Sequence, residues 1–229
     1  MIARRKQELW DALSAVAPGT QLRDGLDRIS KARMGALIVV GDGPEVLNVC
    51  SGGFLLDAAF TPQRLSELAK MDGAIIWWAD SSRSARANVH LVPNPNVPTT
   101  ETGTRHRTPE RVARSVGAPV ATVSEDMAVL TVYRGDEKYQ LESIPNILNR
   151  CDQALQTLER YKSRLNEELA SLTAHEVEGL VTLRDVIVVL QRSEMVSRIA
   201  DELRHHLIEL GADGRLVRLQ LRDLMAGVG

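Results

Sequence analysis

The 229-residue sequence has few cysteines, no long apolar run and no excess of charge of either sign. Its two cysteines, Cys50 and Cys151, lie far apart and form no Cys-x-x-Cys spacing. A disulfide framework and a zinc site are therefore not indicated, and we expect both cysteines to be buried as small apolar residues. No stretch approaches the roughly 18–20 apolar residues of a membrane helix, and the N-terminus lacks an apolar signal core, so we expect a cytoplasmic protein without membrane contact.

The charge balance limits the kinds of partner. Lys and Arg total 28 and Asp and Glu total 30, a formal net charge of −2, so the whole chain has no general attraction to nucleic acid or anionic membranes. Any phosphate binding must be local. The common nucleotide signatures G-x-x-x-x-G-K-[ST] and helix-opening G-x-G-x-x-G are absent, as are H-E-x-x-H and G-x-S-x-G. Ordinary P-loop ATPases and dinucleotide-binding dehydrogenases are thereby excluded.

The first part of the chain alternates helical and β-rich patterns. Strict apolar runs, Gly-Asp turns and a Thr61-Pro62 helix start predict a mixed α/β domain over residues 1–142, in which helices flank a central mixed sheet. Residues 36–40 and 46–50 are interpreted as a hairpin around Gly41-Asp-Gly43. The other expected helices cover 1–17, 21–33 and 109–116, and the other expected strands cover 74–78, 87–92, 120–124, 128–133 and 138–142.

Residues 143–229 form a second, helical segment. Apolar residues alternate at spacings of three and four, with one polar intruder, in the seam formed by Leu148, Cys151, Leu155, Leu158, Lys162, Leu165, Leu169 and Leu172. Thr173-Ala-His-Glu176 fits a capping box that would begin a second helix, and a third helix is expected to end at Gly211. Because no second run of equal length is evident, the seam favours contact between copies of the chain over packing within one chain.

Glu101-Thr-Gly-Thr-Arg-His-Arg-Thr108 is interpreted as a loop before a helix. Arg side chains form paired, charge-assisted bonds to phosphate oxygens, and free backbone N–H groups at a helix start add to the attraction for an anion. The loop is therefore a candidate phosphate site. The alternative is a solvated basic turn.

Acidic residues occur at two further junctions. Asp72-Gly73 precedes the apolar strand at 74–78, where a carboxylate and a closely approaching backbone could hold a divalent metal and a ribose or phosphate. Glu125 and Asp126 follow Ser124 at another strand end and offer two more oxygen ligands. Ordinary polar turns remain the alternative for both junctions.

Together these motifs resemble the diadenylate cyclase domain of the DNA integrity scanning protein family, DisA. The family's D-G-A motif is found as Asp72-Gly73-Ala74, and its G-T-R-H-R motif as Gly103-Thr104-Arg105-His106-Arg107. Ser51-Gly-Gly-Phe54, Ala87-Asn-Val-His-Leu-Val-Pro93 and Thr157-Leu-Glu-Arg-Tyr-Lys162 are also similar, as are parts of the tail. The resemblance covers essentially the whole chain.

The resemblance implies condensation of two ATP molecules into cyclic di-AMP with release of two pyrophosphates. It implies Mg²⁺ or Mn²⁺ as cofactor and an octamer of facing dimers, because each active site holds half of the reaction. The implied catalytic residues are Asp72, Arg105, His106 and Arg107; the substrate-binding residues Gly73, Ala74, Leu91, Thr104, Thr108 and Ser124; and the metal ligands Asp72, Asp126 and Glu125.

Two departures from the family pattern stand out. Glu125-Asp126 looks more like the Ser-Glu-Glu motif of membrane-anchored cyclases than like the basic or neutral residues usual after this serine. The family's helix-hairpin-helix module is not part of the sequence, so DNA binding is expected only of a longer chain. A nucleotide-binding sensor without turnover is the main alternative function, and a coiled-coil scaffold is a third.

Overall fold

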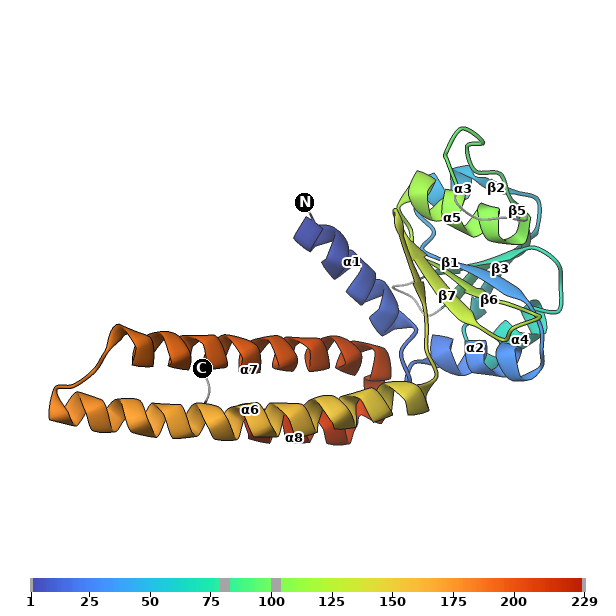
Figure 1. Ribbon diagram of the computed structural model, residues 1–229. Helices are drawn as coiled ribbons and strands as arrows, with labels where there is room; N and C mark the ends of the chain where they lie inside the picture. Colours follow the sequence, from blue (N-terminus) through green and yellow to red (C-terminus); the bar gives the residue numbers. More distant parts are fainter. Residues whose placement is uncertain (1, 79–82, 100–103, 228–229) are drawn as a thin grey trace. The chain divides into compact units, whose positions relative to one another are not determined.

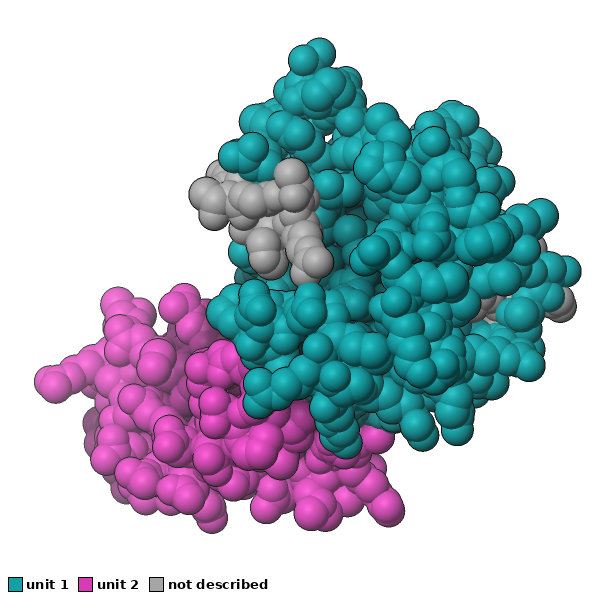
Figure 2. Space-filling view, turned by 90° about the vertical axis from the view of Figure 1, so that its right-hand side faces the viewer, with its two compact units in different colours: residues 1–141 teal, residues 142–229 magenta. Residues whose placement is uncertain are grey.

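The computed structural model describes residues 2–78, 83–99 and 104–227, and it divides the chain into two compact units, residues 1–141 and 142–229 (Figures 1 and 2). The first unit is mixed α/β and the second is helical, which confirms the predicted fold class. Each unit has its own apolar core.

An eight-stranded sheet forms the centre of the first unit, in the order β2-β5-β4-β1-β6-β7-β8, with β3 paired to β5. Strands β1 and β4 are parallel, and the other neighbours are antiparallel. The strands are β1 (Ala36–Val40), β2 (Cys50–Ser51), β3 (Phe54–Ala59), β4 (Ala74–Trp78), β5 (Arg83–Leu91), β6 (Val120–Val123), β7 (Leu130–Arg134) and β8 (Glu137–Gln140).

Five helices accompany the sheet: α1 (Ile2–Ala15), α2 (Gln21–Lys31), α3 (Pro44–Asn48), α4 (Pro62–Leu68) and α5 (Thr104–Val116). Helices α3 and α5 lie at one face of the sheet and α2 and α4 at the other (Figure 1). Val112 and Ala113 of α5 are fully buried against strand residues such as Val39 and Ile76. The expected N-caps are confirmed at α4, where the Thr61 hydroxyl accepts a hydrogen bond from the Arg64 N–H.

Two predictions in this unit are wrong, and one strand was not predicted. The hairpin expected from residues 36–40 and 46–50 does not form: β1 pairs with β4 and β6, and residues 44–48 form a helix. Pro44 suits the first turn of a helix, and this helix buries Val46. Helix α5 begins at Thr104 rather than Pro109, so residues 104–108 belong to a helix and not to a loop. Strand β3 was not expected, since two of its residues, Phe54 and Leu55, are exposed and give no clear alternation.

The second unit consists of α6 (Ile144–Glu178), α7 (Leu183–Leu210), the 3₁₀ turn η1 (Gly211–Gly214) and α8 (Arg215–Met225). The predicted helix start at Thr173 is wrong: α6 continues through it, with the Thr173 hydroxyl bonded to the Leu169 carbonyl at 2.9 Å. The helix ends at Gly179, whose φ of 69° is left-handed. The capping box is found instead at Thr182 and Asp185, where hydrogen bonds from Thr182 lower the pKa of Asp185.

The buried part of the predicted seam is covered within its own chain rather than by another copy, whereas Leu169 is 41% exposed. Cys151, Leu155, Leu158 and Leu165 are buried in one cluster with Val196, Ala200, Leu203 and Leu207 of α7 and Val217 and Leu221 of α8. The seam packs against residues of two helices, α7 and α8, so the sequence contains no single apolar run of equal length that matches it. Burial and the nearby carboxylates of Asp152 and Glu209 raise the pKa of the Cys151 thiol to about 11, and Cys50 is only half-buried.

Candidate functional site

A cavity of about 620 Å³ in the first unit collects most of the residues implicated by the sequence motifs. Four chain segments line it, at residues 34–37, 69–74, 89–91 and 122–126, together with Thr108 of α5. These segments come from the beginnings or ends of β1, β4, β5 and β6, which are neighbours in the sheet. The predicted residues at the cavity are Asp72, Gly73, Ala74, Leu91, Thr108, Ser124, Glu125 and Asp126.

Asp72 and Gly73 form the sharp connection between α4 and β4. Helix α4 ends at Ala69, and Asp72 is exposed at the cavity, where a ligand can reach its carboxylate. Gly73 has φ +101°, and a Cβ at this position would lie 2.9 Å from the Asn88 carbonyl carbon and the Val89 oxygen. Both the backbone conformation and the close approach of β5 therefore require glycine.

Strand β5 is irregular where it faces this connection. Ala74 pairs with Val89 and Ile76 pairs with Arg86, so β5 contains an extra residue between these two pairs. Asn88 lies in this bulge and has φ +56°, a left-handed conformation that asparagine tolerates better than most residues. Beyond the bulge, His90 is exposed and Leu91 is buried, and both line the cavity.

The turn between β6 and β7 carries the second pair of acids. The Ser124 backbone N–H donates to the Val129 carbonyl at 2.9 Å, and the Ala128 N–H donates to the Ser124 carbonyl at 3.0 Å. The Ser124 hydroxyl also accepts a hydrogen bond from the Met127 N–H at 3.4 Å. These bonds close the turn and leave Glu125 and Asp126 exposed at the cavity.

Three carboxylates, those of Asp72, Glu125 and Asp126, thus line one cavity. Within the described ranges, however, no three His, Cys, Asp or Glu side chains are close enough to hold a metal ion by themselves. This arrangement fits Mg²⁺, which proteins commonly bind through one or two carboxylates while substrate phosphates and water complete the octahedron.

The basic motif forms the first turns of α5. Thr108 lines the cavity, whereas Arg107 has an exposed side chain and is not among the lining residues. Gly103 and the side chains of Thr104, Arg105 and His106 lie outside the described part of the structure. The backbone from Thr104 onwards is helical, so the motif supplies the N–H groups of a helix start as well as its cations.

Sequence reasoning missed several lining residues, including Met34, Lys70, His90 and Thr122. Lys70 lies two residues before Asp72, and His90 lies within the similar run at 87–93, so closeness to these motifs was the available signal. Met34 and Thr122 reach the cavity only because β1 pairs with both β4 and β6. No spacing in the sequence indicates this pairing.

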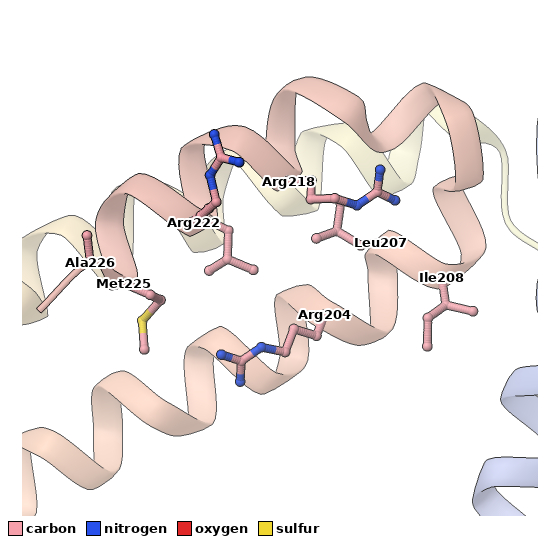
Figure 3. A pocket seen from close by; sticks show the side chains of 8 residues that line it. Arg204, Leu207, Ile208, Arg218, Arg222, Met225 and Ala226 are labelled. Atoms are coloured by element: carbon pink, nitrogen blue, oxygen red, sulfur yellow. The ribbon is translucent and has the colours of Figure 1, made fainter. Parts of the chain in front are cut away.

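A second cavity, of about 780 Å³, lies between α7 and α8 in the helical unit and is lined partly by Arg204, Arg218 and Arg222 (Figure 3). The three guanidinium groups point in different directions (Figure 3). Arg204 pairs with Asp201 at 2.5 Å, and Arg218 donates to the Gly211 carbonyl at 3.3 Å. The arginines therefore do not converge on one anion.

In the described ranges, none of the helices combines the length and hydropathy needed to cross a membrane.

Two family models match the chain, and their boundary lies close to the boundary between the two compact units. Residues 23–138 match the family model described as DisA bacterial checkpoint controller nucleotide-binding, and residues 141–229 match the DisA bacterial checkpoint controller linker region. The structure of DacA from Staphylococcus aureus is 21% identical with a TM-score of 0.44, over 61% of this chain and 90% of that one.

Two DNA integrity scanning proteins DisA are much more similar in sequence. The one from Parafrankia sp. is 56% identical over 94% of this chain and 60% of its own length, and the one from Kineococcus radiotolerans is 55% identical over 96% and 62%. The chain thus spans about 60% of these relatives. With both family models matched in order across its two units, the chain belongs to the DisA bacterial checkpoint controller family.

Proposed function

We propose that the protein is a diadenylate cyclase, which joins two ATP molecules into cyclic di-AMP and releases two pyrophosphates. The observation that carries this proposal is the single cavity that gathers the Asp72-Gly73-Ala74 turn, Leu91, Thr108 and the acidic turn after β6. The nucleotide-binding family model covers all of these segments.

The reaction consists of two identical nucleotidyl transfers. In each transfer, the 3′-oxygen of one ATP forms a bond to the α-phosphorus of the other, and the bond from that phosphorus to the β-phosphate bridging oxygen breaks. The 3′-hydroxyl loses a proton, and pyrophosphate leaves with the electron pair. A ribose hydroxyl is a weak nucleophile at neutral pH, so the site must favour its deprotonation and stabilise charge on the phosphates.

Named residues fit these requirements. Asp72, with Glu125 or Asp126, would hold Mg²⁺ or Mn²⁺, which supplies positive charge at the α-phosphate and lowers the pKa of the 3′-hydroxyl. Thr104, Arg105, His106, Arg107 and Thr108 would hold the triphosphate at the start of α5. Gly73 and Ala74 would allow the ribose to approach, backbone groups near Leu91 would contact the adenine, and Ser124 would contact the substrate beside the acidic turn.

Two such sites must face each other, because each bound ATP supplies both a nucleophile and an electrophile to its counterpart. A homo-oligomer built from facing dimers, with an octamer as the expected form, meets this need. We further propose a cytoplasmic location, in keeping with the nucleotide substrate, and DNA binding only by a longer chain that carries an additional module.

The test is incubation of the purified protein with ATP and Mn²⁺, followed by chromatography and mass analysis of the products. Cyclic di-AMP with two pyrophosphates per product supports the cyclase. Bound but unchanged ATP would instead support the nucleotide sensor. The absence of both ATP binding and turnover would contradict both functions. In the same assay, Asp72→Asn tests the proposed site, and Asp24→Asn, which neutralises an exposed acid on α2, is its surface control.

A further inference from the structure

The start of α5 has an intrinsic weakness. Pro109 lies inside the helix, and because proline has no backbone N–H, the carbonyl of residue 105 lacks its usual helical partner. Proline also disfavours the helical conformation of the residue before it, here Thr108. The turns that carry the phosphate-binding motif therefore need support from outside the helix.

A buried ionic cluster on the next turn supplies a candidate for that support. Glu110 is only 6% exposed, although a carboxylate is rarely buried without partners. Its Oε1 lies 3.0 Å from Nη2 of Arg114, and its Oε2 accepts a hydrogen bond from the Thr99 hydroxyl. The charge of Glu110 is thus compensated by a cation of the same helix and by a donor from another segment.

The same helix holds the neighbouring residues of that segment. Nε of Arg111 donates to the Val97 carbonyl at 3.1 Å, and Nη1 of Arg114 donates to the Pro98 carbonyl. Residues 97, 98 and 99 are therefore bonded in succession to the side chains of α5. Helix α5 begins at Thr104, so the bonded residues 97–99 lie shortly before the motif in the sequence.

We propose that Glu110 and Thr99 are positioning residues, which hold the segment at 97–99 on α5 and thereby fix the helix start that binds the ATP phosphates. This inference rests on the proposed function for its ligand. Neither residue lines the cavity, so both would act through the motif rather than by touching substrate.

The experiment compares variants of the whole protein. Thr99→Val removes the donor and keeps the side-chain shape, whereas Thr99→Ser keeps the hydroxyl. Val112→Ala, in the fully buried core face of the same helix, lowers stability without altering any bond to the 97–99 segment. Two readouts are used: backbone hydrogen exchange of peptides spanning residues 104–108, and the KM and kcat for ATP.

We expect Thr99→Val to speed exchange at 104–108 by about tenfold or more and to raise the KM for ATP by a similar factor, with a smaller effect on kcat. Thr99→Ser should restore both values to near those of the parent. Glu110→Gln, which removes the charge opposite Arg114, should act in the same direction as Thr99→Val.

Unchanged hydrogen exchange and an unchanged KM in Thr99→Val would overturn the proposal. It would also be overturned if Val112→Ala, with the same melting temperature as Thr99→Val, changed the exchange and the KM equally. The exchange measurement needs no activity. If the parent protein neither binds nor converts ATP, the proposed function fails while faster exchange in Thr99→Val would still show that the cluster holds the helix start.

Discussion

The Lys162 ammonium group caps the C-terminus of α8 by donating hydrogen bonds to the carbonyls of Leu224 and Ala226, the latter at 3.0 Å. Lys162 is the polar intruder in the apolar seam of α6. The helix C-terminus carries unpaired carbonyls and a partial negative charge, which a cation satisfies well. A residue that interrupts the seam pattern thus joins two helices of the second unit.

Replacing Lys162 with Met should lower the free energy of unfolding of the protein by about 0.5–2 kcal/mol, because the methionine keeps the apolar stem but leaves the carbonyls without their cationic donor. Urea unfolding followed by circular dichroism measures this change. Arg160→Met, which removes an exposed charge from the same helix, should have little effect. Equal destabilisation by both variants would contradict a specific capping role.

The buried seam predicts a steep difference between positions along α6. Leu158→Ala opens a cavity in the core shared with α7 and α8 and should cost about 2–5 kcal/mol, whereas Leu169→Ala, at a position 41% exposed, should cost much less. Triple replacement of Leu155, Leu158 and Leu165 by Asp should unfold the helical unit. A folded triple variant that merely changed its oligomeric state would show that the seam instead packs between chains.

Asp72→Asn should abolish synthesis of cyclic di-AMP while ATP binding survives, because the amide keeps the shape of the side chain and loses the charge that would hold the metal. Turnover is measured chromatographically and binding by calorimetry. Parental turnover at saturating Mn²⁺ would remove Asp72 from the set of metal ligands.

Joint replacement of Glu125 and Asp126 by Ala should raise the metal concentration needed for half-maximal activity. Both side chains are exposed at the cavity, and backbone hydrogen bonds between Ser124, Ala128 and Val129 close the turn, so the fold should be retained. Of the two single variants, Asp126→Ala should have the larger effect. An unchanged metal titration would return both acids to the role of a surface turn.

Gly73→Ala and Gly41→Ala form a matched pair. Both glycines have positive φ, of +101° and +122°, but a Cβ at Gly41 has nothing within 4 Å whereas one at Gly73 meets the backbone of β5. Gly41→Ala should therefore cost only the conformational strain, about 1–3 kcal/mol, while Gly73→Ala should also displace β5 and weaken ATP binding. Thermal unfolding and calorimetric titration with ATP separate the two effects.

Local patterns in the sequence predicted most of the elements of the first unit. The strand at 74–78 is a continuous apolar run, and Thr61-Pro62 combines an N-cap with a suitable first-turn residue, so each element follows from its own residues. The motif around Asp72 was likewise visible, because the acid and the glycine are adjacent in the chain.

Tertiary structure decided what depends on partners distant in the sequence. That Asp72 and Asp126 share one cavity follows from the order β4-β1-β6 in the sheet, and no local spacing encodes that order. Residues 104–108 are helical although they precede Pro109, which by local rules marks a helix start. The same helix continues to Val112 and Ala113, which are buried against the sheet. The spacing of the α6 seam predicts an apolar surface, but the hydrophobic effect is non-directional, so the spacing does not specify which surface packs against it. Which helices cover that surface was settled only by the return of α7 and α8 along the same chain.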